Sequence, residues 1–358
     1  SGEYCDSALA AEFGMLPPAF LPLSYNRLFE AQIENYGDQV SSIFLTVPKD
    51  FPVPSADMTR LNRYGVNLLP TEAGLSLKQA TLTALRKLPG DESLALLFGD
   101  TLMVDFDLSQ TDQIAVAATD GYFPWADVSE THNGLSIQMG YQNDQDKRNV
   151  ACGLYTFHSA DDFLKVLNFS PDFHTAVEMY SRQHGLKLLS GIWYDFGHLP
   201  LFFRSRKDML VSRAFNNIKS DGRIVHKSSI DKEKMRAEAN WFDSIPESIR
   251  IYTPQFFGLI EAEGRSGYSS EYLYLPTLSD LAVFGRLPLF VWRRILNSCF
   301  DFQRECRKIT EIDRMRLVKE GFCNFFFDSM ISTKSTTRFS SFLDSRGWQE
   351  CTRVELNG

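Results

Sequence analysis

The fold is decided by residues 93–100, which read Ser-Leu-Ala-Leu-Leu-Phe-Gly-Asp. This apolar run lies between turn signals, as is typical of a strand buried on both faces of a parallel sheet. Before it come patterns for a helix at 27–36, strands at 42–47 and 66–69, and a helix at 75–88. Strands and helices that alternate with short connections predict a Rossmann-like, three-layer α/β domain with a mostly parallel sheet. Ligands bind beyond the carboxyl ends of such strands, which is where Asp100 stands.

The length of the chain, 358 residues, predicts two domains, because single domains commonly contain about 100–200 residues. A cluster of basic residues, Arg204, Arg206, Lys207 and Arg213, separates two well-patterned regions. We therefore expect a first domain at 1–205 and a second at 206–358. In the second, an Asp-Gly turn at 221–222 between strands at 214–218 and 223–227 predicts a hairpin. A helix at 231–242, strands at 256–262 and 269–275, and helices at 291–306 and 312–330 are expected after it.

The charge balance, the cysteines and the hydropathy of the chain limit the classes of function that we expect. The chain carries 37 Lys and Arg against 45 Asp and Glu, a net charge of −8, so we expect no nucleic-acid partner. Six cysteines without a Cys-x-x-Cys pair predict reduced, mostly buried thiols. Because there is neither a run of about 18 apolar residues nor a basic-then-apolar leader, we expect a cytoplasmic protein without membrane contact. The chain begins Ser-Gly without Met, and we expect a few natural residues to precede it.

Five motifs in the first half resemble those of the sugar nucleotidyltransferase family, in the family's order. They are residues 20–23 (Phe-Leu-Pro-Leu), 69–75 (Leu-Pro-Thr-Glu-Ala-Gly-Leu), 96–102 (Leu-Leu-Phe-Gly-Asp-Thr-Leu), 153–157 (Gly-Leu-Tyr-Thr-Phe) and 193–198 (Trp-Tyr-Asp-Phe-Gly-His). The resemblance implies that Asp100 and Asp195 hold a catalytic Mg²⁺ ion. It also implies that Glu72, Gly74 and Gly99 contact the nucleotide.

Nucleotidyl transfer brings two anionic phosphates together, so it depends on charge neutralisation and in-line positioning. Two carboxylates suffice for Mg²⁺, because this ion takes its other ligands from water and substrate phosphates. The family's Gly-rich phosphate loop is not present, and Pro-Pro-Ala at 17–19 replaces the lysine that usually precedes Leu-Leu-Pro. Arg27 is the residue that we expect to compensate.

The second half resembles the N-terminal lobe of the aminoglycoside phosphotransferase and choline kinase superfamily, an α+β kinase-like lobe here followed by a helical extension. The resemblance rests on residues 224–228 (Ile-Val-His-Lys-Ser), 234–238 (Lys-Met-Arg-Ala-Glu) and 271–278 (Glu-Tyr-Leu-Tyr-Leu-Pro-Thr-Leu). It implies that Lys227 contacts ATP phosphates and pairs with Glu238. The superfamily's catalytic His-Gly-Asp-x-x-x-x-Asn loop is absent from this sequence, so the lobe is expected to be truncated or inactive.

One function and two alternatives to it follow from these expectations. The first is an enzyme that joins an NTP to a phosphorylated sugar or amino alcohol with release of pyrophosphate, for capsular or other surface polysaccharide synthesis. The alternative is a non-catalytic nucleotide-binding or scaffold protein of the same pathway, or a small-molecule kinase whose catalytic lobe is missing from this chain. Homo-oligomerisation is left open. His198 and the aromatic residues around 193–203 are expected to be structural rather than catalytic.

Overall fold

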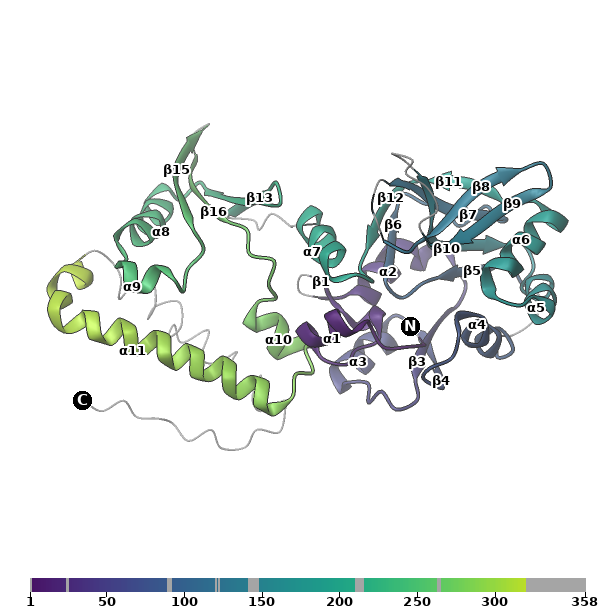
Figure 1. Ribbon diagram of the computed structural model, residues 1–358, viewed down its shortest axis with the longest axis horizontal. Coiled ribbons are helices and arrows are strands. Elements are labelled where there is room, and N and C mark those ends of the chain that lie inside the picture. Colours follow the sequence, from purple (N-terminus) through teal and green to yellow (C-terminus); the bar gives the residue numbers. More distant parts are fainter. Residues whose placement is uncertain are drawn as a thin grey trace. The chain divides into compact units, whose positions relative to one another are not determined.

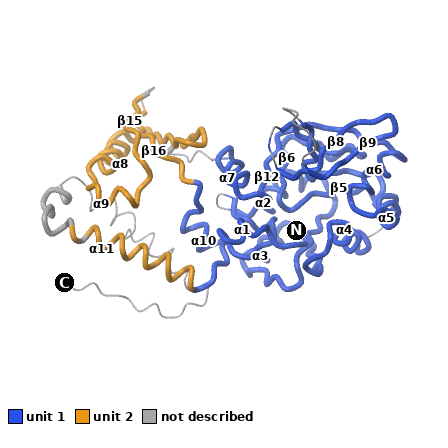
Figure 2. Tube along the Cα trace, viewed as in Figure 1, with its two compact units in different colours: residues 1–209, 274–289 blue, residues 210–273, 290–358 orange. Residues whose placement is uncertain are grey.

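Residues 2–23, 26–88, 92–119, 121, 123–140, 148–209, 216–262 and 265–319 are described by a computed structural model (Figure 1). The chain divides into two compact units, coloured separately in Figure 2. Unit 1 comprises residues 1–209 and 274–289, and unit 2 comprises residues 210–273 and 290–358. The expected boundary at 205/206 therefore needs correction: unit 1 ends at Met209, and a later segment returns to it.

Several helices of unit 1 begin at local capping signals. Ser76 caps α4 in a reciprocal capping box with Gln79, and Ser159 and Asp172 cap α5 and α6 through their side-chain oxygens. The helices are α1 (Ser7–Phe13), α2 (Leu28–Tyr36), α3 (Ser55–Arg63), α4 (Leu77–Leu85), α5 (Ala160–Phe169), α6 (Phe173–His184), α7 (Leu199–Asp208) and α10 (Leu278–Phe284), with 3-10 turns at Pro18–Phe20 and Gly37–Gln39.

The strands of unit 1 form one large sheet and three pairs. The six-stranded sheet contains β5 (Leu94–Leu97), β7 (Gln113–Thr119), β8 (Ala126–Thr131), β9 (Gly134–Met139), β10 (Arg148–Phe157) and β11 (Lys187–Ser190). Its order is β11-β7-β10-β8-β9, and β5 also pairs with β10. The pairs are β1 (Pro22–Leu23) with β2 (Asn26–Arg27), β3 (Ile43–Pro48) with β4 (Val66–Thr71), and β6 (Thr101–Val104) with β12 (Ile192–Asp195).

The fold is mixed α/β, but the expectation of a mostly parallel sheet is wrong for the described strands. Only β3 with β4 and β11 with β7 run parallel, and β5 pairs antiparallel with β10. The crossover through α3 gives the parallel pair β3–β4, as the alternating pattern predicted. β8 and β9 are joined by a short turn and therefore pair antiparallel. β10 runs antiparallel to β5, β7 and β8, and no described helix lies between β6 and β10 to supply a parallel crossover.

The large sheet is covered on one face by α5 and α6, which lie side by side in Figure 1. Their apolar faces join the inner side chains of the strands in one core. Phe157 stacks on Phe163 with 3.9 Å between ring centroids, and Tyr180 meets Phe157 edge-on at 4.9 Å. A further set of fully buried side chains belongs to the N-terminal segments, the connection after β12, and α7, namely Leu9, Phe13, Phe20, Leu28, Phe196 and Phe202.

A cleft of about 720 Å³ lies between the β3–β4 pair and β5. All four residues of β5 line it, together with Phe44 and Thr46 of β3 and the apolar face of α4. Within the described residues, β3 pairs only with β4 and β5 only with β10. Among the described strands, one edge of each is therefore left without a strand partner, and Gly99 and Asp100 also line the cleft.

Unit 2 contains a four-stranded antiparallel sheet, ordered β13-β14-β16-β15, with α8 packed on it. Its elements are β13 (Asn216–Ser220), β14 (Ile224–Ser229), α8 (Lys232–Ser244), α9 (Glu247–Arg250), β15 (Phe256–Ala262), β16 (Arg265–Glu271) and α11 (Leu289–Lys319), whose first residue is in unit 1. The predicted hairpin and helix are present. The two predicted C-terminal helices are one continuous α11 as far as Lys319, and the rest of the 312–330 prediction lies outside the described residues.

Two further expectations can be compared with the described part of the chain. None of its helices combines the length and apolar character required to cross a membrane. In this part of the chain, Cys5 and Cys152 are buried free thiols and Cys299 is a partly buried one.

Candidate active site

Asp100 and Asp195 are brought together by strand pairing. Asp100 lies in the turn between β5 and β6, after Gly99, and Asp195 is the last residue of β12. Because β12 runs antiparallel to β6 with Asp195 opposite Thr101, the two aspartates are neighbours across the ladder. The amide of Phe196 donates to the carbonyl oxygen of Asp100 at 2.8 Å and fixes this end of the pair.

The space around Gly197 shows that the carboxylates of Asp100 and Asp195 lie close to each other. A Cβ atom placed on Gly197 would lie 2.5 Å from Oδ2 of Asp100 and 3.4 Å from Oδ1 of Asp195. Both carboxylates therefore face the same point, and any side chain at position 197 would collide with Asp100. The Gly197 amide also donates to Oδ1 of Asp195 at 2.7 Å. The glycine in the Asp-Phe-Gly sequence is thus a requirement of the site.

The second oxygen of Asp195 is held by two side chains. Nε1 of Trp125 donates to Oδ2 at 2.7 Å, and Nδ1 of His198 lies 3.2 Å from the same atom. Only 9% of Asp195 is exposed, so these bonds fix its orientation within a largely buried setting. Trp125 is a residue that the sequence analysis missed. The signal was present as an aromatic, Pro124-interrupted Phe-Pro-Trp segment after a strand, but nothing local linked it to Asp195.

The charges of the two carboxylates act on each other and on His198. Burial, and then the charge of Asp195, raise the pKa of Asp100 above its ordinary value. The hydrogen bond with Asp195 is the main cause that raises the pKa of His198, with smaller contributions from the Asp195 and Asp100 charges. The site therefore favours a positive partner. Two convergent carboxylates are also the hard oxygen ligands that Mg²⁺ prefers, so the donor set fits this ion.

Aromatic rings surround His198 on one side of the carboxylates. Its ring centroid lies 4.7 Å from that of Phe123 and 6.1 Å from that of Trp125, which meets Trp193 edge-on at 5.1 Å. Arg148 stands over the Trp125 ring at 5.8 Å and pairs with Asp127. His198 is half-buried and hydrogen-bonded, as a structural histidine would be, yet it lies within the candidate site.

The residues expected to contact the nucleotide are not gathered in one place. Gly99 lines the cleft beside Asp100. Glu72 is exposed and pairs with Lys49, whereas Gly74 has a positive φ of 77° and open space where a side chain would stand. Leu75, directly after that loop, lines the cleft, but Glu72 and Gly74 do not.

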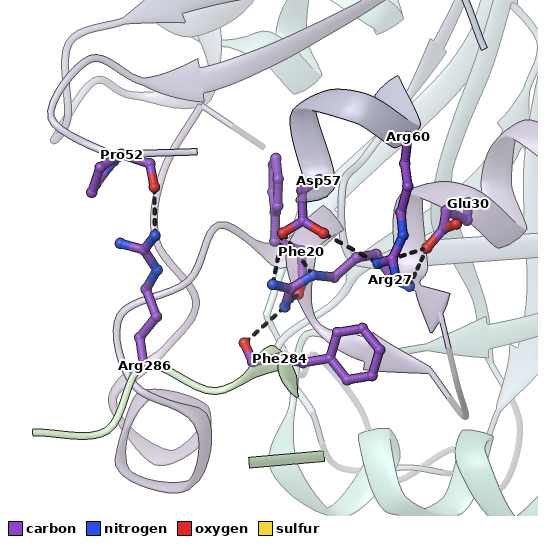
Figure 3. Close-up of polar contacts among 8 residues, drawn as sticks. All are labelled: Phe20, Arg27, Glu30, Pro52, Asp57, Arg60, Phe284 and Arg286. Atoms are coloured by element: carbon purple, nitrogen blue, oxygen red, sulfur yellow. Dashed lines mark hydrogen bonds and ion pairs between the residues drawn. The ribbon is translucent and has the colours of Figure 1, made fainter. Parts of the chain in front are cut away.

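Arg27 is placed in the interior of unit 1 (Figure 3). It is 1% exposed, and both Nε and Nη2 donate to Oδ2 of Asp57, at 3.1 and 2.7 Å. Nη1 donates to the carbonyl oxygens of Phe20 and Phe284, at 2.6 and 2.8 Å. Burial lowers the pKa of Arg27, although the Asp57 charge opposes this effect. With its donors engaged inside unit 1, Arg27 does not have the phosphate-binding geometry that the sequence suggested.

Comparison with known proteins gives structural similarity alone. No protein-family model matches the chain, and no curated protein matches it. Part of the chain is similar to solved nucleotidyltransferases.

Three of the similar structures are distant in sequence. HddC from Yersinia pseudotuberculosis has a TM-score of 0.42 at 14% identity, over 55% of this chain and 91% of that one. CTP:phosphocholine cytidylyltransferase (LicC) from Streptococcus pneumoniae has a TM-score of 0.42 at 10% identity, over 54% and 90%. The inositol-1-phosphate CTP transferase from T. maritima has a TM-score of 0.40 at 15% identity, over 54% and 85%. At these distances, the function proposed below rests on the geometry of Asp100 and Asp195.

In unit 2, Lys227 and Glu238 form the ion pair that the sequence suggested. Lys227 on β14 lies 2.5 Å from Oε2 of Glu238 on α8, and the Tyr268 hydroxyl donates to the same oxygen at 3.0 Å. Glu238 is 3% exposed, whereas Lys227 is partly accessible. Burial, and then the Glu238 charge, raise the pKa of Tyr268, which keeps its hydroxyl a donor. The arrangement holds the lysine at a fixed position on the sheet.

Proposed function

We propose that unit 1 is a Mg²⁺-dependent nucleotidyltransferase that joins an NTP to a phosphorylated sugar or amino alcohol and releases pyrophosphate. The observation that carries this proposal is the convergence of Asp100 and Asp195 on one point beside Gly197. The donor set supports it, because two convergent carboxylates offer the oxygen ligands that Mg²⁺ prefers. A role in surface polysaccharide synthesis belongs to the same proposal.

The residues of the site would divide the work as follows. Asp100 and Asp195 would hold Mg²⁺, which when bound supplies charge neutralisation for the phosphates. Trp125, His198 and the Gly197 amide would keep the Asp195 carboxylate in its binding orientation. The cleft that borders Gly99 and Asp100 would receive the substrate. Glu72 and Gly74 lie outside its lining, so their proposed contact with the base rests on the sequence resemblance and would need the loop at 72–74 to approach the substrate.

The first experiment is a pyrophosphate-release assay with each of the four NTPs and a panel of sugar and amino-alcohol phosphates. Asp100→Asn and Asp195→Asn should each lower turnover at least about a hundredfold, which is the scale for loss of one preorganised electrostatic group. Asp107→Asn is the matched control, since Asp107 is an exposed residue after β6. Activity that persists in Asp100→Asn, together with no magnesium requirement, would refute the proposal.

A non-catalytic nucleotide-binding protein is the second candidate, and one observation favours it. Among the described residues that line the cleft there is no Lys or Arg, whereas Glu3, Glu92 and Asp100 all do line it. A triphosphate would then depend on the metal ion for its positive charge. Binding of an NTP by the wild-type chain without pyrophosphate release from any acceptor would favour this candidate over the enzyme.

For unit 2 we propose binding of ATP phosphates by Lys227, without phosphoryl transfer. The ion pair with Glu238 supports this role, because a positioned lysine can meet the α- and β-phosphates. Both variants are made in the Asp100→Asn background, so that nucleotide binding at the proposed site of unit 1 is weakened. In that background, Lys227→Met should weaken ATP binding by at least about tenfold, whereas Lys219→Met on the neighbouring strand should not. Equal affinity of the two variants would exclude a nucleotide role for Lys227.

A further inference from the structure

A cluster of two histidines and one aspartate lies in unit 1 at one end of α5 and α6, outside the candidate active site. His158 follows β10 directly, Asp162 lies in the first turn of α5, and His184 is the last residue of α6. One ligand atom of each residue lies within 4.8 Å of the others. Residues from three separate positions in the chain thus present two imidazoles and one carboxylate to a common point.

The imidazole of His158 is oriented by a second carboxylate. Its Nδ1 lies 3.0 Å from both oxygens of Asp112, and the Tyr180 hydroxyl donates to Oδ1 of Asp112 at 2.8 Å. With Nδ1 directed to Asp112, Nε2 is directed toward Asp162, whose Oδ2 lies at 3.8 Å. Histidines that bind metals commonly donate their other ring N–H to a carboxylate in this manner, which fixes the tautomer.

The point between the three ligand atoms is accessible from solvent. Lys165 pairs with Oδ1 of Asp162 at 2.8 Å, so the Oδ2 atom stays directed to the histidines. His158 and His184 are exposed, with 4.8 Å between their ring centroids. A hollow of about 390 Å³ borders both Asp162 and His184 and is lined further by Phe169, which is 86% exposed. A ligand at the central point would therefore be reached from solvent.

We propose that His158, Asp162 and His184 bind a divalent transition-metal ion of the zinc class. Imidazole nitrogens suit zinc and its neighbours, whereas Mg²⁺ prefers oxygen ligands, so this site is chemically distinct from the pair Asp100 and Asp195. Three protein ligands leave a fourth tetrahedral position for water or a small ligand, on the side of the hollow. With Zn–N bonds of about 2.0–2.1 Å, the ligand atoms must approach by roughly 1 Å, within reach of rotamer adjustment.

The proposed ion would link the start of α5 to the end of α6. Both helices supply the core that covers the large sheet, and Tyr180 of α6 contacts that core and Asp112 at once. Binding would therefore stabilise unit 1 as a ligand that binds only the native state. If the cluster is only a set of hydrogen-bonded side chains, added metal ion should leave the stability of unit 1 unchanged.

The test uses the full chain, freed of metals and kept in excess Mg²⁺ so that the paired aspartates are occupied. Calorimetric titration with Zn²⁺ should give one site per chain. His184→Ala and Asp162→Asn should each weaken Zn²⁺ binding more than tenfold, and Asp112→Asn by about 10–100-fold, since it removes only the partner of a ligand. His174→Ala is the matched control, because His174 lies on the same helix outside the cluster.

Further readouts keep the proposal falsifiable. Circular dichroism checks that each variant is folded, and His184→Gln serves in place of any His184→Ala protein that is not. Co²⁺ should give the visible absorption bands of a tetrahedral site in the wild type and lose them in the His184 variant. Zn²⁺ binding unchanged in both His184→Ala and Asp162→Asn would overturn the proposal. Zn²⁺ binding that is lost in Asp100→Asn but kept in His184→Ala would also overturn the proposal. Since Asp100→Asn should leave Zn²⁺ binding intact, this result is independent of the proposed transferase activity.

Discussion

Burial determines what Arg27 can do. An arginine before a helix could bind a phosphate, and nothing in its local sequence excludes that. In the fold its guanidinium is surrounded by Asp57, two carbonyl oxygens and the ring of Phe284, whose centroid is 4.9 Å from Cζ. A buried charge is tolerated only when it is paired and hydrogen-bonded, and here both conditions are met.

Removal of the Arg27 guanidinium should therefore destabilise unit 1. Arg27→Met should lower the free energy of unfolding by about 3–5 kcal/mol, because Asp57 is left buried without its main partner. Arg63→Met, on the exposed side of α3, should change it by less than about 0.5 kcal/mol. Urea denaturation measures both.

The double replacement Arg27→Met with Asp57→Leu sharpens this test, since it removes both charges. It should be more stable than Arg27→Met alone. If Arg27→Met instead kept full stability and lost NTP turnover, the phosphate role suggested by the sequence would be restored.

Asp172 should make stability depend on pH through the N-terminus of α6. The Thr175 amide donates to Oδ1 of Asp172 at 2.9 Å, and this bond is the main cause that lowers the pKa of Asp172 below its ordinary value of 3.8. A carboxyl with a lowered folded-state pKa stabilises the protein above its unfolded pKa, and that contribution is lost as pH falls through the folded value.

Asp172→Ala should thus cost about 1 kcal/mol at neutral pH and progressively less below about pH 4. Asp172→Asn keeps a capping oxygen, so it should cost less than Asp172→Ala at neutral pH. Because neither variant titrates at this position, both costs should fall by the same amount on acidification, and the difference between the two variants should not depend on pH. Thermal unfolding at a series of pH values provides the measurement. A cost of Asp172→Ala that stays constant down to pH 2 would show that the charge of Asp172 contributes nothing.

Among the secondary-structure elements, the position of a strand depends on local sequence, whereas its pairing partner depends on distant residues. The apolar run that defines β5 and the turn at Gly99 were both predicted, because side-chain pattern and turn residues act over a few positions. The partner of β5 was not. A strand with one apolar pattern can pair in either sense, and the antiparallel return of β10 follows from connections more than 50 residues away.

The open edge of β5 should be visible in hydrogen exchange. Amides that donate to β10 should be protected, whereas the alternate amides, which face the cleft, should exchange quickly. Mass spectrometry with residue-level fragmentation, or NMR, resolves this alternation over residues 94–97. Uniform protection along β5 would mean that another segment pairs with its second edge in solution.

At the scale of the whole molecule, the chain leaves unit 1 and comes back. Residues 274–289 contribute Asp280, which pairs with Arg206 at 2.8 Å, and Phe284, whose carbonyl accepts from Arg27. The Arg286 amide donates to the Phe13 carbonyl oxygen at 2.6 Å. A boundary drawn once along the sequence cannot describe such a unit.

A chain that ends at Met209 should therefore be less stable than unit 1 of the whole protein. It lacks the Phe284 carbonyl oxygen, which is one acceptor of Arg27, and Asp280, which pairs with Arg206, and it exposes the surface that Phe284 covers. Addition of a peptide of residues 274–289 should raise its unfolding midpoint with increasing peptide concentration. The same peptide with Phe284→Ala is the control and should be less effective. An equal midpoint with and without the peptide would remove the segment from the fold of unit 1.

Local sequence patterns were sufficient to predict the elements around β5 and the hairpin of unit 2, because each depends on side-chain pattern and turn chemistry within a few residues. The pairing of Asp100 with Asp195 and of Lys227 with Glu238 was expected from resemblance to known families, and in the structure each pair joins separate elements. Only the tertiary structure decided that Arg27 is buried, that the large sheet is mainly antiparallel, that residues 274–289 return to unit 1, and that His158, Asp162 and His184 converge. The reason is physical: burial, strand partnership and the charge around a side chain are set by groups far away in sequence, which no local pattern contains.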